Sequence, residues 1–211
     1  MHDMSTPDIG MKVKEGYEHN NYNDVYRPNN RITVFEKKCL DLFLSQLVEN
    51  ATILDLGCGA ANTYDCYMVK QGYKVVGIDF SQKQIRQAQK NCPKATFICK
   101  DILDFPISDV YGGITFFYSL FHINREQHEQ LFKKIYDNTS SNCVILLNIR
   151  KEDSGGIKVK SDFCDCPMYW SHYSSDVFIN IMKKIGYVAT IIGDEKDYGS
   201  SESHLWLFLR K

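Results

Sequence analysis

The sequence predicts an α/β domain built on one doubly wound, mostly parallel sheet of seven strands, with helices on both faces. Three observations support this fold class. Short apolar runs alternate with helical patterns of about ten residues or more, joined by short loops, as in βαβ units. A glycine turn, Gly57 to Gly59, follows the first apolar run. The last two runs are separated only by a polar loop, which predicts an adjacent antiparallel pair.

The predicted elements begin after a polar and aromatic segment. Residues 1–30 are interpreted as an N-terminal arm that folds over the ligand site, and residues 31–211 as a single domain. Apolar residues at helical spacing from Ile32 to Leu47 predict an amphipathic helix of about four turns. The same reasoning predicts strands over 51–56, 73–79, 95–99, 113–118, 143–148, 187–192 and 204–210, and helices over 60–71, 81–90, 125–136 and 175–185.

The charge balance and the apolar content of the chain limit the kinds of partner it can bind. The 211 residues include 25 Lys plus Arg and 26 Asp plus Glu, so no net field draws the chain to nucleic acid or to an anionic membrane. No apolar stretch approaches the about 20 residues that span a bilayer. We therefore expect a small-molecule partner, no nucleic acid or membrane partner, a monomer or homodimer, and a cytoplasmic location.

The cysteines predict reduced thiols. The eight cysteines are scattered, several lie in apolar runs, and no CxxC pair occurs. Cys164 and Cys166 are too close together for the usual zinc-ligand spacing and have no matching Cys or His pair. No metal site is expected.

A first acidic signal accompanies the glycine turn. The carboxyl ends of parallel strands form the ligand crevice of an open sheet, and Asp55 lies near the end of the first predicted strand. Gly57 and Gly59 let the backbone turn sharply and approach a ligand without a Cβ in the way. Asp55 can accept a hydrogen bond or face a cation.

Two further acids end the next strands. Asp79 follows Gly59 by about 20 residues, where a carboxylate can accept both ribose hydroxyls of an adenosine, and Phe80 offers a flat surface for a base. Asp101 suits the exocyclic amine of adenine, with Ile102 as an aliphatic cover. The alternatives are a solvated strand-end acid for Asp79 and a helix N-cap for Asp101. Together, the acids at three strand ends indicate an adenosine-bearing ligand.

These motifs support a resemblance to a known family. The segments Ile53–Ala60, Val76–Ser81, Lys100–Asp101 and Phe117–His122 resemble the successive signature motifs of class I S-adenosylmethionine-dependent methyltransferases. The resemblance runs from about Arg31 to the C-terminus. It implies a Rossmann-like fold, S-adenosylmethionine as cofactor, S-adenosylhomocysteine as product, and methyl transfer to O, N or S of a small molecule.

The resemblance also implies a role for each matching residue. The methionine moiety would face Asp55 and the turn backbone, Asp79 would hold the ribose, and Asp101 would accept the adenine amine. The remaining implied contacts are Gly57, Cys58 and Gly59 at the turn, Phe80 and Ile102 around adenine, Phe117, Tyr118 and Ser119 beside the sulfonium, and Tyr26 from the arm.

Two histidines are catalytic candidates. His122 follows the fourth strand and would lie on the substrate side with a pKa near neutrality, which suits a general base. The alternative is that His122 only hydrogen-bonds a neighbouring loop. His172 is a second candidate, and Tyr169, Trp170 and Tyr173 either wall a substrate pocket or belong to the core. His128 is expected to be solvated.

Two other functions remain open at this stage. An NAD-dependent oxidoreductase would normally have a third glycine where this chain has Asn62. A non-catalytic sensor or scaffold protein would use the same pocket to bind S-adenosylmethionine, and it would show tight cofactor binding without turnover.

Overall fold

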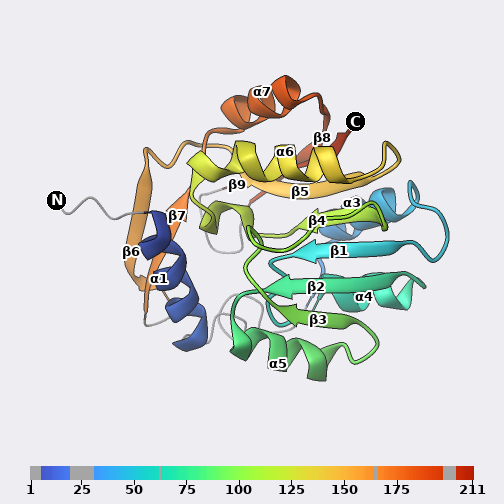
Figure 1. The fold of residues 1–211 in the computed structure, drawn as a ribbon, viewed down its shortest axis with the longest axis horizontal. Coiled ribbons are helices and arrows are strands. Elements are labelled where there is room, and N and C mark those ends of the chain that lie inside the picture. Colours follow the sequence, from blue (N-terminus) through green and yellow to red (C-terminus); the bar gives the residue numbers. More distant parts are fainter. Residues whose placement is uncertain (1–5, 20–30, 62, 164–165, 197–202) are drawn as a thin grey trace.

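The fold is that of a computed structural model, which describes residues 6–19, 31–61, 63–163, 166–196 and 203–211. Its centre is a seven-stranded sheet with the order β3-β2-β1-β4-β5-β9-β8 (Figure 1). Neighbouring strands are parallel except that β9 runs antiparallel to β5 and β8. The strands are β1 Thr52–Leu56, β2 Lys74–Asp79, β3 Thr96–Cys99, β4 Tyr111–Phe116, β5 Val144–Arg150, β8 Val188–Lys196 and β9 Ser203–Arg210. The predicted fold class is confirmed.

Helices cover both faces of this sheet. One face packs against α6 and α7 through a cluster that includes Phe132 and Phe178. The other face packs against α3 and α4 through Phe43 and Met68, with Trp206 of β9 fully buried among them. The helices are α3 Val34–Leu44, α4 Tyr64–Lys70, α5 Gln82–Asn91, α6 His128–Asn138 and α7 Ser175–Ile185, and short 3-10 turns are η1 Leu120–His122 and η2 Arg125–Gln127.

Local signals explain where helices begin and end. Thr33 and Glu36 form a capping box at the start of α3, and the Ser81 side chain accepts a hydrogen bond from the Gln84 N–H at the start of α5. Gly186, in the left-handed conformation, ends α7. The predicted helix over 60–71 begins only at Tyr64, because the glycine turn continues beyond Gly59.

Three elements lie outside the predicted pattern. α1 (Thr6–His19) is a helix within the segment interpreted as an arm, and β6 (Ile157–Phe163) pairs with β7 (Cys166–Ser171) in a separate two-stranded sheet. Figure 1 shows α1 beside this hairpin. Val13 of α1 is buried against Met168 and Tyr169 of β7, so one small apolar cluster joins the two segments.

The cysteines, His128 and the lengths of the helices also bear on what the sequence predicts. The thiols of Cys39, Cys58, Cys92 and Cys143 are free and buried, as predicted, whereas the free thiol of Cys66 is partly exposed and that of Cys99 is exposed. The expectation for His128 is wrong, because this residue is 1% exposed and its Nε2 lies 3.0 Å from the Ile123 carbonyl oxygen. Across the described ranges, every helix is too short or too polar to span a bilayer.

Candidate functional site

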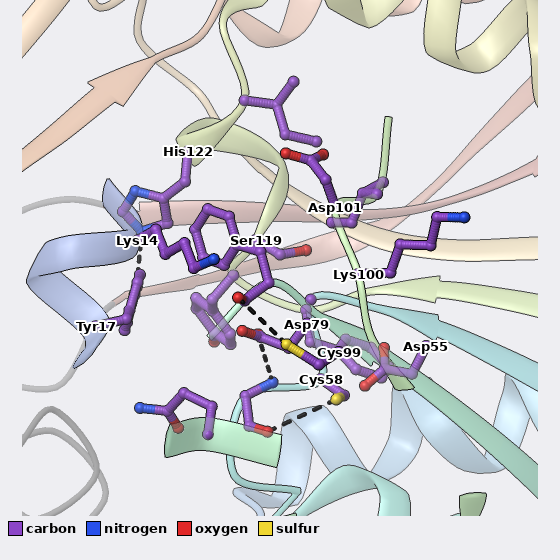
Figure 2. Close-up of a pocket in the computed structure, with 18 of the residues that line it drawn as sticks. Lys14, Tyr17, Asp55, Cys58, Asp79, Cys99, Lys100, Asp101, Ser119 and His122 are labelled. Atoms are coloured by element: carbon purple, nitrogen blue, oxygen red, sulfur yellow. Dashed lines mark hydrogen bonds between the residues drawn. The ribbon is translucent and has the colours of Figure 1, made fainter. Parts of the chain in front are cut away.

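A cavity of about 600 Å³ lies at the carboxyl ends of β1, β2 and β4, beside α1 (Figure 2). The structure brings most of the candidate residues together around it, although they come from four separate stretches of sequence. The candidate residues that line the cavity are Asp55, Gly57, Cys58, Gly59, Asp79, Phe80, Asp101, Ile102, Phe117, Tyr118, Ser119 and His122.

The glycine turn is packed directly against the end of β4. Gly57 has a φ of +90°, and both its N–H and that of Cys58 donate to the Ile78 carbonyl oxygen, at 2.8 and 3.0 Å. Ser119 donates its hydroxyl proton to the Leu56 carbonyl oxygen at 2.6 Å. The turn therefore presents bare backbone to the cavity, with Ser119 seated against it.

Asp79 is held by backbone donors on both carboxylate oxygens. Its Oδ2 accepts from the Gly59 N–H at 3.0 Å, and its Oδ1 accepts from the Ser81 N–H at 2.8 Å. Burial raises the pKa of Asp79 to about 6, against the opposing effect of these two hydrogen bonds. The side chain is 8% exposed, so its orientation is fixed before any ligand arrives.

A second buried acid accompanies Asp55. Asp55 and Asp65 are each 2% exposed, and the Thr115 hydroxyl donates to Asp55 Oδ1 at 2.6 Å. Burial raises the pKa of Asp55 to about 7, and burial together with the Asp55 charge raises the pKa of Asp65 well above its usual range. Asp65 Oδ1 is buried without a hydrogen-bond partner in the described part of the chain. Two buried carboxyl groups thus form an acidic floor beneath the cavity.

Asp101 has a local role as well as a place on the cavity wall. Its Oδ1 accepts from the Leu103 N–H at 2.8 Å, and its carbonyl oxygen accepts from the Asp104 N–H at 3.2 Å. The side chain of Asp101 therefore bonds the following backbone as a helix N-cap would, which was the alternative interpretation, although no regular helix follows. Ile102 beside it is half-buried, as is Phe80, which contacts the cluster between α1 and β7.

His122 has both ring nitrogens engaged. Nδ1 lies 2.8 Å from the Tyr169 carbonyl oxygen, and Nε2 lies 2.8 Å from the Tyr17 hydroxyl of α1. Burial lowers the pKa of His122 to about 4, so the ring is neutral at physiological pH. Lys14, one turn earlier on α1, lines the same side of the cavity. Figure 2 shows Lys14, Tyr17 and His122 together, on the side away from Lys100.

The aromatic wall beside Ser119 is fixed by a buried acid on α3. Tyr118 has a φ of +57°, its N–H donates to Asn148 Oδ1 at 2.8 Å, and its hydroxyl donates to Glu36 Oε1 at 3.2 Å. Tyr64 donates to the same oxygen at 2.5 Å. Phe117 packs on the Tyr64 ring, with centroids 4.4 Å apart. Glu36 therefore orients two of the tyrosines that line the cavity.

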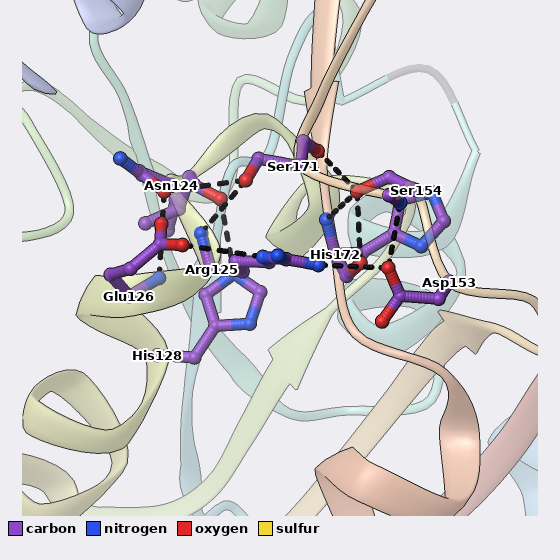
Figure 3. Close-up of polar contacts among 11 residues, drawn as sticks. Asn124, Arg125, Glu126, His128, Asp153, Ser154, Ser171 and His172 are labelled. Carbon is purple, nitrogen blue, oxygen red and sulfur yellow. Dashed lines mark hydrogen bonds and ion pairs between the residues drawn. The ribbon is translucent and has the colours of Figure 1, made fainter.

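The structure does not bring His172 to this cavity. His172 lies after β7, where its backbone N–H and carbonyl oxygen are both bonded to the Ser154 hydroxyl, at 3.0 and 2.9 Å. Figure 3 shows this cluster, in which Arg125 pairs with Asp153 at 2.8 Å and its N–H donates to the Ser171 hydroxyl. These contacts hold η2 against the hairpin. The other candidate not placed at the cavity, Tyr26, lies outside the described residues.

Some cavity residues were missed from the sequence. Asp65 follows the glycine turn by six positions and had no strand-end position to mark it. Lys14 and Tyr17 are spaced three apart, as neighbours on one helix face are, but their segment carried too few apolar residues to reveal a helix.

Comparison with known proteins finds a family model that matches part of the chain. Residues 53–142 match the family described as a methyltransferase domain. A curated Haemophilus influenzae relative, described as an uncharacterized protein, is 25% identical over 151 residues, which cover 61% of this chain and 59% of the relative. The match therefore spans less than two thirds of that relative.

Solved structures share the fold at low identity. A Synechocystis magnesium protoporphyrin IX methyltransferase, solved with S-adenosylhomocysteine, has a TM-score of 0.69 and 14% identity, and the alignment covers 97% of this chain and 100% of that one. A Burkholderia thailandensis 1,6-didemethyltoxoflavin-N1-methyltransferase, solved with its acceptor and S-adenosylhomocysteine, has a TM-score of 0.70 and 12% identity, with coverage of 99% and 91%.

Proposed function

We propose that this chain methylates a small molecule with S-adenosylmethionine, since residues 53–142 match a methyltransferase-domain family and the chain shares the fold of solved methyltransferases. The acceptor receives the methyl group on O, N or S, and S-adenosylhomocysteine is released. Residues 31–211 form the catalytic domain in this proposal, and residues 1–30 form the arm over the cofactor, with α1 as part of it.

The observation that carries the proposal is the convergence of buried acids on one cavity. Asp55, Asp65 and Asp79 line it together beside the glycine turn. A carboxylate oxygen that accepts one backbone N–H retains capacity for a second donor, so Asp79 can accept one ribose hydroxyl on each oxygen. The acidic floor suits a ligand that carries positive charge, as the sulfonium and ammonium groups of S-adenosylmethionine do.

The chain's own residues fit this cofactor. The buried Oδ1 of Asp65, which has no hydrogen-bond partner among the described residues, needs a donor, and an ammonium group at the turn would supply one. The backbone at Gly57 and Gly59 allows close approach of the methionine moiety. Phe80 and Ile102 would enclose the adenine ring, and the Asp101 carboxylate, whose Oδ1 already accepts one N–H, would accept its amine.

Methyl transfer depends mainly on how the protein positions the acceptor relative to the cofactor. When bound, the cofactor supplies a methyl group on a cationic sulfur. A nucleophile in line with the C–S bond would attack the methyl carbon, and the sulfur would leave. Phe117, Tyr118 and Ser119 would line the transfer position, where Glu36 and Asn148 fix the Tyr118 orientation before binding. α1 and its contacts with the hairpin would exclude water from the acceptor side.

The proposed acceptor is small for two reasons. The chain has no excess of basic residues that would follow a nucleic-acid backbone. The Burkholderia thailandensis enzyme, which shares the fold over nearly the whole chain, acts by its name on the small molecule 1,6-didemethyltoxoflavin.

Isothermal titration with S-adenosylhomocysteine tests the proposal. The wild type should bind, and Asp79→Ala should weaken binding about 10- to 1,000-fold, because each charged hydrogen bond contributes about 1.5–3 kcal/mol. Asp109→Ala is the matched control, since Asp109 is exposed and lies away from the cavity lining. No heat at millimolar ligand, or equal affinity of the two variants, would remove the assignment.

A further inference from the structure

The direction of two hydrogen bonds at His122 fixes its tautomer. A carbonyl oxygen can only accept, so the contact between Nδ1 and the Tyr169 carbonyl oxygen requires the proton on Nδ1. Nε2 of the neutral ring then carries a lone pair. It follows that Tyr17 donates its hydroxyl proton to Nε2 across the 2.8 Å contact.

This direction determines what the Tyr17 oxygen can offer to a ligand. A phenol has one proton to donate, and that proton is directed to His122, so the oxygen meets a further group as an acceptor. The ring geometry supports a fixed pair, because the two rings meet edge to face with centroids 5.4 Å apart. His122 also packs against Phe121 and Trp170, at 4.9 and 5.6 Å between centroids. A ligand atom at Tyr17 must therefore bring a hydrogen.

The positive charge of Lys14, on the same side of the cavity as Tyr17, restricts the chemical class of the methyl acceptor further. Lys14 lines the cavity beside Tyr17, and among the residues that the structure describes no carboxylate is paired with its ammonium. A cation next to the nucleophile disfavours a protonated amine and favours a group that gains negative charge as it reacts. Figure 2 shows Lys14 reaching from α1 into the space in front of Ser119.

We propose that the acceptor is a small molecule with an acidic hydroxyl, a phenol or an enol, which donates to Tyr17 while its oxygen faces Lys14. The proposal rests on the proposed methyltransferase function and adds the acceptor class and two positions on α1 to it.

The proton balance of the step follows from the same contacts. The acceptor oxygen keeps the electrons of its O–H bond and forms the new O–C bond, and the electrons of the broken C–S bond go to sulfur. The acceptor proton moves to Tyr17 as the Tyr17 proton moves to His122 Nε2. One positive charge disappears from sulfur and one appears on the imidazole, so the net charge of the site is unchanged in the step. The imidazolium then loses its proton to solvent.

The test uses matched pairs of probes on protein saturated with S-adenosylhomocysteine. Phenol and 4-fluorophenol offer the hydroxyl and keep its proton at neutral pH, whereas anisole and 4-fluoroanisole are the same rings with the proton replaced by methyl. Calorimetry should show at least tenfold tighter binding of each phenol than of its methyl ether. Tyr17→Phe should abolish that preference, and Lys14→Met should weaken phenol binding several-fold. Lys12→Met, on the same helix but away from the cavity lining, should behave as the wild type.

The controls separate this proposal from the function it rests on. S-adenosylhomocysteine affinity should stay within twofold in all three variants, which also shows that they are folded. Turnover of phenol with S-adenosylmethionine, followed as formation of radiolabelled anisole, should fall about 100-fold or more in Tyr17→Phe. Failure of the wild type to bind S-adenosylhomocysteine would overturn the methyltransferase proposal itself. Normal binding of S-adenosylhomocysteine with no preference for the phenols, or loss of its affinity in Lys14→Met, would overturn only the acceptor class.

Discussion

A Cβ placed on Gly57 would lie 2.3 Å from the Cβ of Ser119. The turn after β1 and the segment after β4 are therefore in direct contact, and only a residue without a side chain fits between them. Because the φ of Gly57 is +90°, the backbone itself also favours glycine there. Two independent constraints meet at the turn that faces the proposed methionine moiety.

Gly57→Ala should be strongly destabilising and should abolish cofactor binding. Left-handed strain of about 1–2 kcal/mol adds to about 1–3 kcal/mol of overpacking, so we expect the free energy of unfolding in urea to fall by about 2–5 kcal/mol. Gly59→Ala is the matched control, since its φ is +53° but the nearest atom to its Cβ is Gln84 Oε1 at 3.8 Å. Ser119→Gly should restore part of the stability lost in Gly57→Ala. Equal losses at Gly57 and Gly59 would contradict the contact described above.

The buried acids should make the ligand-free protein less stable as the pH rises. Asp55 and Asp79 have ordinary pKa values of 3.8, and burial raises them to about 7 and about 6. The folded state thus binds more protons than the unfolded state between about pH 4 and 7, and the stability that these protons contribute is lost as the pH passes through the folded-state pKa values. Thermal unfolding should show a smaller pH-dependent loss of Tm from pH 5 to 8 in Asp55→Asn than in the wild type. An unchanged slope would contradict the raised pKa of Asp55.

Cofactor affinity should change with pH in the opposite direction. Ionised Asp55 and Asp79 attract a cationic ligand and accept its donors, whereas their protonated forms do so weakly. The Kd of S-adenosylmethionine should therefore decrease from pH 5 to pH 8, with most of the change between about pH 6 and 7. Asp55→Asn should weaken binding at pH 8 and reduce the pH dependence, while Asp104→Asn, at an exposed carboxylate, serves as control. If the affinity for S-adenosylmethionine did not change between pH 5 and 8, the ionisation of these buried carboxyl groups would not contribute to binding.

Much of the fold was accessible from the sequence because its signals are local. Apolar runs and the Ser81 cap marked the strands and α5, and the polar loop before β9 identified the antiparallel pair. α1 and the β6–β7 hairpin were not accessible, since each is stabilised by contact with the other. Val13 and Met168 are fully buried only because the two segments pack together, and no periodic pattern in either segment records that contact.

The candidate site likewise combines residues that local sequence signals reveal with residues that only contacts between distant segments bring together. Asp79 and Gly57 lie at strand ends, where the topology alone brings residues to one crevice. Asp65 and Tyr17 reach the cavity from helices, and Glu36 of α3 holds two tyrosines that line it, so these roles depend on which helix face turns inward. His122 was expected to be a base with a pKa near neutrality, but desolvation of its ring lowers the pKa to about 4. That shift depends on residues from α1 and β7, which the local sequence around His122 does not contain.

Glu36→Gln should loosen the tyrosine wall while leaving the fold intact. Glu36 Oε1 accepts from both Tyr64 and Tyr118, and its Oε2 accepts from the Thr33 N–H at 2.9 Å. An amide supplies only one accepting atom for these donors, so we expect a loss of about 1–3 kcal/mol in unfolding free energy. Affinity for S-adenosylhomocysteine should also fall, because Tyr118 lines the cavity. Glu49→Gln, at an exposed position, is the control, and equal effects at the two positions would refute the wall's dependence on Glu36.

Substitutions of the two histidines proposed from the sequence, His122 and His172, should have different effects on the rate of methyl transfer. His172 lies among Ser154 and the hairpin contacts, so His172→Ala should leave both the S-adenosylhomocysteine affinity and the methyl-transfer rate within about twofold of the wild type. His122→Asn can still donate to the Tyr169 carbonyl oxygen from its amide but does not extend to the Tyr17 hydroxyl. Cofactor affinity should therefore persist while the transfer rate falls by about 100-fold, as for loss of a proton acceptor. Calorimetry and a radiolabelled methyl-transfer assay on both variants would settle the assignment. A rate loss in His172→Ala as large as in His122→Asn would place the acceptor on the other side of η1.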